Sequence, residues 1–253
     1  MTDYTITNTF TLPSLGKVYA REINPQVTLR SMTTADEMKR LNRSDRAYLA
    51  MSDVLDSCIV NDIGISAYDL CLADYQFLTH KLRIITYGTK YSVNTRCPFC
   101  GSDELRDLDL LNDITFTDFD PKLFERYSSF ELPACGKKIT LRMQSPRLLD
   151  DINLRVAEIK KTSKSANGDP AFLYTIASMI DTIDDKHYED FEIIEFVRNL
   201  QMMDTNYIIK ASDKLNNFFG LNPIYERECE VCRLTYKANF QITSEFFGPS
   251  IDI

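Results

Sequence analysis

The sequence contains no tryptophan, only two histidines and no long run of apolar residues. A helix that crosses a membrane needs about 20 consecutive, mostly apolar residues, so the sequence predicts no membrane span. The polar start, Met1 to Phe10, lacks a basic cluster followed by an apolar stretch, and no signal peptide is expected. We therefore expect folding in a cytosol, where the seven cysteines stay as thiols or bind metal rather than form disulfides.

Sequence motifs of common enzymes are also missing, including G-x-S-x-G, the Walker A loop and G-x-G-x-x-G. His80 follows the apolar face of a predicted helix and His187 lies in a charged turn, so both are expected to be structural or solvated. The acidic pairs Asp150/Asp151 and Asp184/Asp185 are interpreted as helix-end and turn charges. No catalytic residue is predicted, and we expect the chain not to be an enzyme.

The charge balance is acidic, with a formal net charge of -8. Such a surface does not attract phosphate backbones as a whole. The one local basic cluster, Lys160, Lys161 and Lys164, is interpreted as the solvated end of a helix. Nucleic-acid binding is therefore disfavoured as the main function.

Apolar residues make up 44% of the 253 residues, and 15 Phe with 13 Tyr replace tryptophan as bulky core material. This is enough for one large domain or two small ones. In the first half we expect a capping box of Thr34 and Glu37 at the start of a helix. The elements predicted there are an arm over 10–19 that turns at Gly16, a strand over 27–30, a helix over 34–58, a helix that begins after Ser66, and a strand over 82–87.

The second half is expected to be mainly helical. Pro146 and Pro170 can each start a helix, and Gly220 is well placed to end one. The predicted elements are a helical turn after Pro121, a strand over 138–143, helices over 146–164 and 170–183, a polar loop over 163–169, a turn over 184–187, and helices over 189–202 and 205–219.

Two C-x-x-C pairs are each placed between stretches that alternate like β-strands. The first is Cys97-Pro-Phe-Cys100-Gly101 and the second is Cys229-Glu-Val-Cys232. The alternating stretches are 91–95 and 105–110 around the first pair, and 224–227 and 234–243 around the second. Each pair is predicted to form the tip of a β-hairpin, where Gly101 supplies a residue with positive φ.

Four cysteine thiolates in a tetrahedron are the preferred ligands of a structural zinc ion. A C-x-x-C turn supplies half of such a site, so we predict one Zn²⁺ bound by Cys97, Cys100, Cys229 and Cys232. One alternative is a thioredoxin-like redox pair, which normally lies between a strand and a helix. The others are an iron–sulfur site, two separate half-sites, and two reduced turns without metal. With all four positions filled by sulfur, no water is left to activate, so the zinc is expected to be structural.

The other three cysteines have simpler interpretations. Cys58 and Cys71 occupy apolar positions of predicted helices and are expected in the core. Cys135 lies in a loop beside Gly136. It is interpreted as a loop cysteine, with a fifth thiol near the metal as the alternative.

Two stretches of the chain resemble each other. Phe10-x-Leu12-Pro13-x-x-Gly16-Lys17 followed by Thr28-Leu29-Arg30 matches Phe130-x-Leu132-Pro133-x-x-Gly136-Lys137 followed by Thr140-Leu141-Arg142. Each precedes helices and then a C-x-x-C hairpin. We predict an α+β fold with an internal duplication into an N-terminal half, 1–120, and a C-terminal half, 121–253, which can pack as a single domain. The 128 residues between the cysteine pairs, 101–228, fit this arrangement.

Several segments resemble the baseplate hub proteins of T-even-like contractile-tailed phages. They are F-T-L-P-S-L-G-K-V-Y over 10–19, T-L-R-S-M-T-T-x-x-E over 28–37, I-I-T-Y-G-x-x-Y-x-V-x-x-x-C-P-F-C-G over 84–101, and the terminal C-x-x-C with F-x-I-T-x-E-F-F-G-P. The second pair departs from the usual pattern, because Glu230 replaces a proline and Arg233 a glycine.

This resemblance implies a virion or assembly protein of the tail baseplate hub, made in the host cytoplasm, whose partners are other hub proteins. The N-terminal arm and the segment Phe246-Phe247-Gly-Pro-Ser-Ile are candidate docking segments, with packing on their own domain as the alternative. A zinc-ribbon regulator that binds nucleic acid and a small metalloenzyme are the competing functions. Acidic residues offset the arginines around the two pairs, which are Arg96, Arg106, Arg227 and Arg233, and this favours the hub protein.

Overall fold

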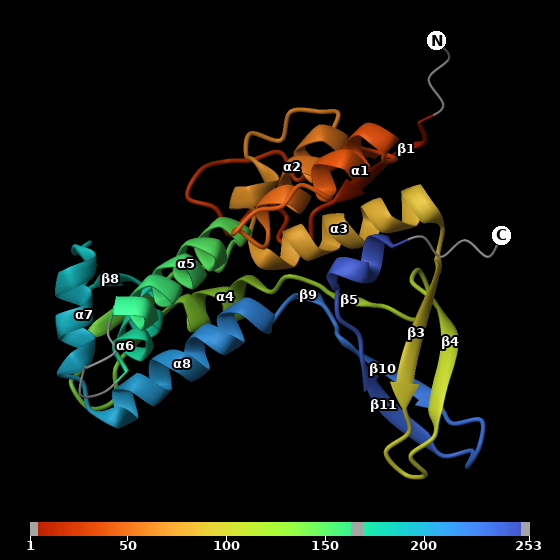
Figure 1. Cartoon of the computed structure of the whole chain (residues 1–253). Helices are drawn as coiled ribbons and strands as arrows, with labels where there is room; N and C mark the ends of the chain where they lie inside the picture. Colours follow the sequence, from red (N-terminus) through yellow and green to blue (C-terminus); the bar gives the residue numbers. More distant parts are fainter. Residues whose placement is uncertain (1–4, 163–168, 249–253) are drawn as a thin grey trace.

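The computed structural model describes residues 5–162 and 169–248, which form a mixed α+β fold (Figure 1). The first elements are β1 (Thr7–Thr11), β2 (Gln26–Arg30), α1 (Thr34–Arg40), α2 (Leu49–Cys58), the 3₁₀ helix η1 (Ala67–Asp69), α3 (Leu72–Tyr87), β3 (Lys90–Arg96), β4 (Asp103–Asp109) and β5 (Phe116–Thr117). Next come α4 (Pro121–Ser128), β6 (Ser129–Glu131), β7 (Lys138–Leu141), α5 (Pro146–Thr162), α6 (Pro170–Ala177), β8 (Ile180–Ile183), α7 (Asp190–Arg198), α8 (Met202–Asn217), β9 (Gly220–Leu221), β10 (Ile224–Glu228), β11 (Thr235–Asn239) and the 3₁₀ helix η2 (Ser244–Phe247).

The described strands form small antiparallel sheets. They pair as β1-β2, β3-β4, β5-β9, β6-β7-β8 and β10-β11. The β3-β4 and β10-β11 hairpins extend side by side from the helical body (Figure 1). Both hairpins with a cysteine pair at the tip were predicted, and both are confirmed.

Two main hydrophobic clusters form the core. One combines the first strands and helices, through residues such as Leu29, Leu55 and Leu78, with Phe246 near the end of the described chain. The other is built from residues such as Ile139 and Ile208, from β7 and α8. The last hairpin therefore leads back to the core of the first helices.

The C-terminal phenylalanines pack on their own chain. Phe246 and Phe247 are buried, and the Nε of the buried Arg83 donates to the Phe246 carbonyl oxygen at 2.8 Å. Of the two expectations for this segment, packing on its own domain is the one found for these residues. The N-terminal arm pairs with β2 through β1.

The predicted helix over 34–58 is wrong, because it is two helices, α1 and α2. Residues 41–47 are mostly exposed and bury no apolar face that would stabilise a helix. Arg46 instead forms an ion pair with Asp151 at 2.7 Å. The capping box also lies one residue earlier than predicted, with Thr33 as N-cap and Asp36 as its partner.

The predicted strand over 82–87 is wrong as well, because these residues form the last turns of α3. Ser66 caps the short η1 and not this long helix. The strand was predicted because Ile84, Ile85 and Thr86 are β-branched residues, which are enriched in strands. Leu82 and Ile85 nevertheless continue the buried helical face of Leu78, and the helix ends at Gly88, whose φ is 87°.

The predicted helix over 170–183 ends at Ala177, and Ile180–Ile183 is the strand β8. Ile183 lies opposite Ile139 and Ile180 opposite Leu141, so β8 completes a sheet whose apolar side chains are buried. The turn over 184–187 is confirmed, with positive φ at Asp184 and Asp185.

The other predicted helices are found close to their expected positions, as α4, α5, α7 and α8. Lys160 and Lys161 are exposed in the last turn of α5, as expected, whereas Lys164 and most of the predicted polar loop lie outside the described residues. Within the described ranges, no helix has the length and apolar character required to span a membrane.

The two arm turns that resemble each other in sequence are held in similar ways. The Asp74 carboxylate accepts hydrogen bonds from the Ser14 N–H at 2.9 Å, the Ser14 hydroxyl and the Tyr19 hydroxyl. The Asp204 carboxylate accepts the N–H groups of Ala134 at 2.8 Å and Cys135 at 3.1 Å. Both aspartates are fully buried and occupy the third position of a 16-residue helix, α3 or α8.

Candidate metal centre

The two C-x-x-C turns have the same backbone hydrogen bonds. In the first knuckle, residues 97–101, the Cys97 N–H donates to Ser102 O and the Gly101 N–H donates to Cys97 O, both at 2.9 Å. In the second knuckle, residues 229–233, the Cys229 N–H donates to Leu234 O at 3.0 Å and the Arg233 N–H to Cys229 O at 2.9 Å. Each turn is therefore closed in the same way across the end of its hairpin.

The residue after each pair has a left-handed backbone conformation. Its φ is 75° at Gly101 and 61° at Arg233. Glycine adopts this conformation without steric cost, whereas a residue with a Cβ does so at a cost of roughly 1 kcal/mol or more. The second knuckle keeps the geometry although its sequence does not favour it.

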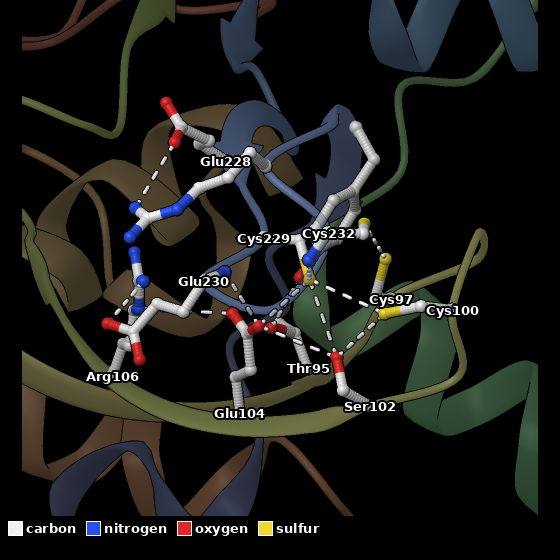
Figure 2. Close-up of polar contacts among 12 residues, drawn as sticks. Thr95, Cys97, Cys100, Ser102, Glu104, Arg106, Glu228, Cys229, Glu230 and Cys232 are labelled. Atoms are coloured by element: carbon white, nitrogen blue, oxygen red, sulfur yellow. Dashed lines mark hydrogen bonds and ion pairs between the residues drawn. The ribbon is translucent and has the colours of Figure 1, made fainter.

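The four sulfur atoms converge between the knuckles (Figure 2). The Sγ atoms of Cys100 and Cys229 are 3.6 Å apart, those of Cys97 and Cys232 are 3.8 Å apart, and all four lie within 4.8 Å of one another. With Zn–S bonds of about 2.3 Å, the edge of a regular tetrahedron of sulfurs is about 3.8 Å. The group therefore has the donors and the spacing that can hold a metal ion.

The surroundings of the thiols differ. Cys97 and Cys229 are buried, Cys232 is half-buried and Cys100 is exposed. Hydrogen bonds from the Ser102 hydroxyl and backbone lower the pKa of Cys100 to about 6. The Leu234 N–H lowers the pKa of Cys232, but partial burial and the neighbouring thiols outweigh it and raise the pKa to about 12. A cation would favour loss of these protons, because thiolates are the form that binds metal.

Glu104 of β4 links the first hairpin to the second knuckle. Its Oε1 accepts the Glu230 N–H at 2.9 Å and lies 3.0 Å from the Cys229 Sγ. Arg106, two residues along the same face, forms an ion pair with the Glu230 carboxylate (Figure 2). The sequence by itself indicates no role for these residues beyond charges that offset one another. The alternation of β4 was a usable signal, because it places Glu104 and Arg106 on the face of the buried Leu108.

The remaining cysteines and histidines lie outside this group in the described part of the chain. Cys58 and Cys71 are buried in the core, as expected, and Cys135 is exposed in the second arm turn. His80 is buried, with its Nε2 3.0 Å from Leu110 O, and burial lowers its pKa to about 4. His187 is exposed in its turn, and its Nδ1 lies 3.2 Å from Asp181 O.

Asp150 was interpreted as a helix-end charge, which is wrong. It is buried and accepts hydrogen bonds from the Tyr48 N–H at 3.0 Å and the Tyr68 hydroxyl at 2.9 Å. These bonds join α5 to the segment before α2 and to η1. Nothing in the local sequence distinguishes Asp150 from the exposed Asp151 beside it.

Four sulfurs around one metal ion would leave no open coordination position for water or substrate. The geometry is therefore suited to holding two hairpins together. Cys100 and Cys229 are 129 residues apart in sequence, so the bond to metal would link distant parts of the chain directly.

A family model described as T4 bacteriophage base plate protein matches residues 4–248. Comparisons with curated proteins and with solved structures find no match.

Proposed function

The chain belongs to the T4 bacteriophage base plate protein family, and from this premise we propose that it is a non-enzymatic structural or assembly component of the base plate hub. Membership makes it a phage tail base plate protein that associates with other tail proteins. The family match over nearly the whole chain is the observation that carries the base plate role, and the resemblance of the arm and cysteine segments to hub proteins supports the hub. The closed sulfur site is consistent with a structural role, because it offers no position for catalysis.

The cofactor proposed is one structural Zn²⁺, bound by Cys97, Cys100, Cys229 and Cys232. The convergence of their sulfurs within 4.8 Å supports it. Both pairs lie between antiparallel strands, which does not suit a thioredoxin-like redox motif. Structural zinc contributes on the order of 10–16 kcal/mol of apparent binding free energy. Here that free energy would stabilise the contact between the two hairpins.

The two halves, 1–120 and 121–253, are proposed to derive from an internal duplication. The matching arm turns, the aspartate at the third position of α3 and α8, and the matching knuckles support it. In this view each half donates one cysteine pair to the shared metal ion.

A nucleic-acid-binding zinc ribbon is the alternative, and the positions of its arginines argue against it. Arg106 forms an ion pair with Glu230, Arg233 lies 3.6 Å from Glu228, and Arg227 is buried. Phosphate contacts require accessible basic side chains. Of the four arginines near the knuckles, only Arg96 is exposed without such an acidic partner in the described chain.

The test combines metal analysis with base plate assembly. The purified chain should contain one zinc per molecule, and base plates isolated from its own phage, or their hub intermediates, should contain the chain. Cys97→Ser should lose the metal and the incorporation, whereas the control Cys135→Ser, which changes an exposed cysteine outside the group, should keep both. Salt-dependent binding to random duplex DNA, with no incorporation into tail assemblies, would favour the regulator instead.

A further inference from the structure

The strand β3 presents one edge that no other strand of the described residues covers. Backbone hydrogen bonds at the two ends of the hairpin show which residues face β4. The Cys97 N–H donates to Ser102 O at one end, and the Leu110 N–H donates to Thr89 O at the other. In an antiparallel pair, hydrogen-bonded positions alternate with non-bonded ones. The odd-numbered residues of β3 therefore direct their backbone groups to β4, and Ser92 and Asn94 direct theirs to the opposite edge.

These outward backbone groups have no partner among the described residues. No hydrogen bond within residues 5–162 and 169–248 reaches the N–H or C=O of Ser92 or Asn94. The opposite edge of the hairpin differs, because β4 carries Asp103, Asp107 and Asp109 there, and the Asp109 N–H is bonded to Asp113. Charged side chains protect an edge from further pairing.

A groove of about 500 Å³ runs along the open edge. It is lined by residues 91–95 of β3, by residues 239–241 with Thr243, and by Tyr225 of β10. None of these residues is charged. The groove therefore accepts uncharged side chains, and β3 offers an added strand the backbone donors and acceptors that it needs.

Two basic residues mark the ends of the same edge. Lys90 and Arg96 are exposed on the outer face of β3, and neither forms an ion pair within the described chain. In β4, their cross-strand neighbours are Asp109 and Asp103. A strand added to the open edge of β3 would lie beside the same two basic side chains, Lys90 and Arg96, which are six positions apart.

Pairing of two β3 strands over their whole length is unfavourable at this edge. Antiparallel pairing of two β3 strands about Val93 would place Ser92 opposite Asn94 and Lys90 opposite Arg96. Like charges directly opposite each other destabilise a strand pair. Charge complementarity therefore selects a different strand, with an acidic residue at each end and an uncharged middle.

We propose that the open edge of β3 docks an extended segment of another base plate protein, which adds a strand with acidic residues six positions apart. The segment would pair with Ser92 and Asn94 and place its alternate side chains in the groove beside Tyr225. Because both ends of β3 are basic, the charges match for a parallel or an antiparallel strand. The inference rests on the proposed structural role and specifies the kind of partner that this role uses.

The test uses the metal-loaded full chain and two blocked synthetic peptides, Asp-Val-Thr-Val-Thr-Val-Asp and Lys-Val-Thr-Val-Thr-Val-Lys. The acidic peptide should shift the NMR amide signals of Ser92 and Asn94 in a concentration-dependent way. The basic peptide should bind at least about tenfold more weakly, because both end pairs become repulsive.

Two proline variants separate the edges of the hairpin. Asn94→Pro removes an outward N–H of β3 and should abolish peptide binding, whereas Leu105→Pro, directly across the ladder, changes the other edge and should leave binding unchanged. Metal content and the thermal midpoint report whether each variant folds.

The proposal is overturned if millimolar acidic peptide leaves the Ser92 and Asn94 signals unchanged, or if the two peptides bind equally. A dimer detected by sedimentation without peptide, and lost in Asn94→Pro, would make a second copy the occupant and would also overturn it. Because the peptide assay involves no phage assembly, its failure is distinct from a failure of incorporation into the base plate.

Discussion

The two knuckles reach one backbone geometry with different residues. The first contains Pro98 and Gly101, which suit the turn, whereas the second has Glu230 and Arg233 at the equivalent positions. The second knuckle is instead contacted from outside, because Glu104 accepts its Glu230 N–H and Arg106 pairs with the Glu230 side chain. The comparison shows that a knuckle can be shaped by its own residues or by the hairpin that faces it.

The arm turns extend the comparison to the two halves. Both use a buried aspartate near the start of a long helix to bind backbone N–H groups. Asp74 also binds the hydroxyls of Ser14 and Tyr19, whereas Asp204 has two backbone partners. Burial raises the pKa of Asp74 despite these hydrogen bonds. The first half therefore has the more extensive polar contact at this position.

The largest effect is expected from loss of the metal. Cys97→Ser and Cys229→Ser each remove one of the four ligands. Both should release the ion and lower the free energy of unfolding by several kcal/mol, because metal binding contributes to folding stability. A chelator should have a similar effect on the unsubstituted chain. Zinc analysis and thermal unfolding measure it. Retention of metal in both variants, each at its intact cysteine pair, would contradict a shared site and would support separate half-sites.

The next effect compares the buried aspartates. Asp74→Ala should destabilise the chain by about 3 kcal/mol and Asp204→Ala by about 2 kcal/mol, because each leaves buried donors unpaired and Asp74 has more of them. Urea denaturation at neutral pH measures both values. Equal losses would show that the hydroxyl bonds of Ser14 and Tyr19 add nothing. Asp151→Ala, at an exposed aspartate on α5, is the control and should change stability by less than about 1 kcal/mol.

The arginines that end the two Thr-Leu-Arg segments provide a third comparison. Arg30 binds Asp36 through two hydrogen bonds, at 2.7 and 3.0 Å, whereas Arg142 lies 3.4 Å from a partly exposed Asp181. The Arg30 hydrogen bonds lower the pKa of Asp36 from 3.8 to about 2. Asp36→Asn should therefore cost about 1–2 kcal/mol at neutral pH. Asp181→Asn should cost less than about 1 kcal/mol.

The acid dependence of Asp36 follows from the direction of its pKa shift. A lowered pKa in the folded state stabilises the chain above the unfolded pKa of 3.8, and this contribution disappears as the pH falls towards about 2. Unfolding free energies measured from pH 6 to pH 2 should therefore converge for Asp36→Asn and the unsubstituted chain. A difference that persists at pH 2 would contradict the assignment.

The smallest effect concerns the left-handed positions of the knuckles. Arg233→Gly should stabilise the chain by about 0.5–1 kcal/mol, because glycine removes the strain and the lost contact with the exposed Glu228 contributes little. Gly101→Ala should destabilise by about 1 kcal/mol for the converse reason. Thermal unfolding of the metal-loaded variants measures both. If Arg233→Gly is destabilising, Arg233 has a packing role that outweighs its backbone strain.

Local patterns in the sequence predicted the α+β class, both cysteine hairpins, the arm turns and most helices of the second half. These features depend on residues close in the chain, namely alternation in strands, proline at helix starts and the fixed spacing of C-x-x-C. Where local composition and packing disagreed, the prediction was wrong. Ile84, Ile85 and Thr86 favoured a strand, but the buried face of Leu78, Leu82 and Ile85 keeps the segment helical.

The sequence by itself determined the kind of site, because four cysteines in two pairs specify the donor chemistry and the hairpins that present it. Tertiary structure decided which groups meet. It brings Cys100 to 3.6 Å from Cys229, buries Asp74, Asp150 and Asp204 and leaves Asp151 exposed, and places Glu104 against the second knuckle. The physical reason is that a cysteine pair needs only neighbouring residues to form, whereas the buried carboxylates of Asp74, Asp150 and Asp204 bind donors that lie 55 to 102 residues away.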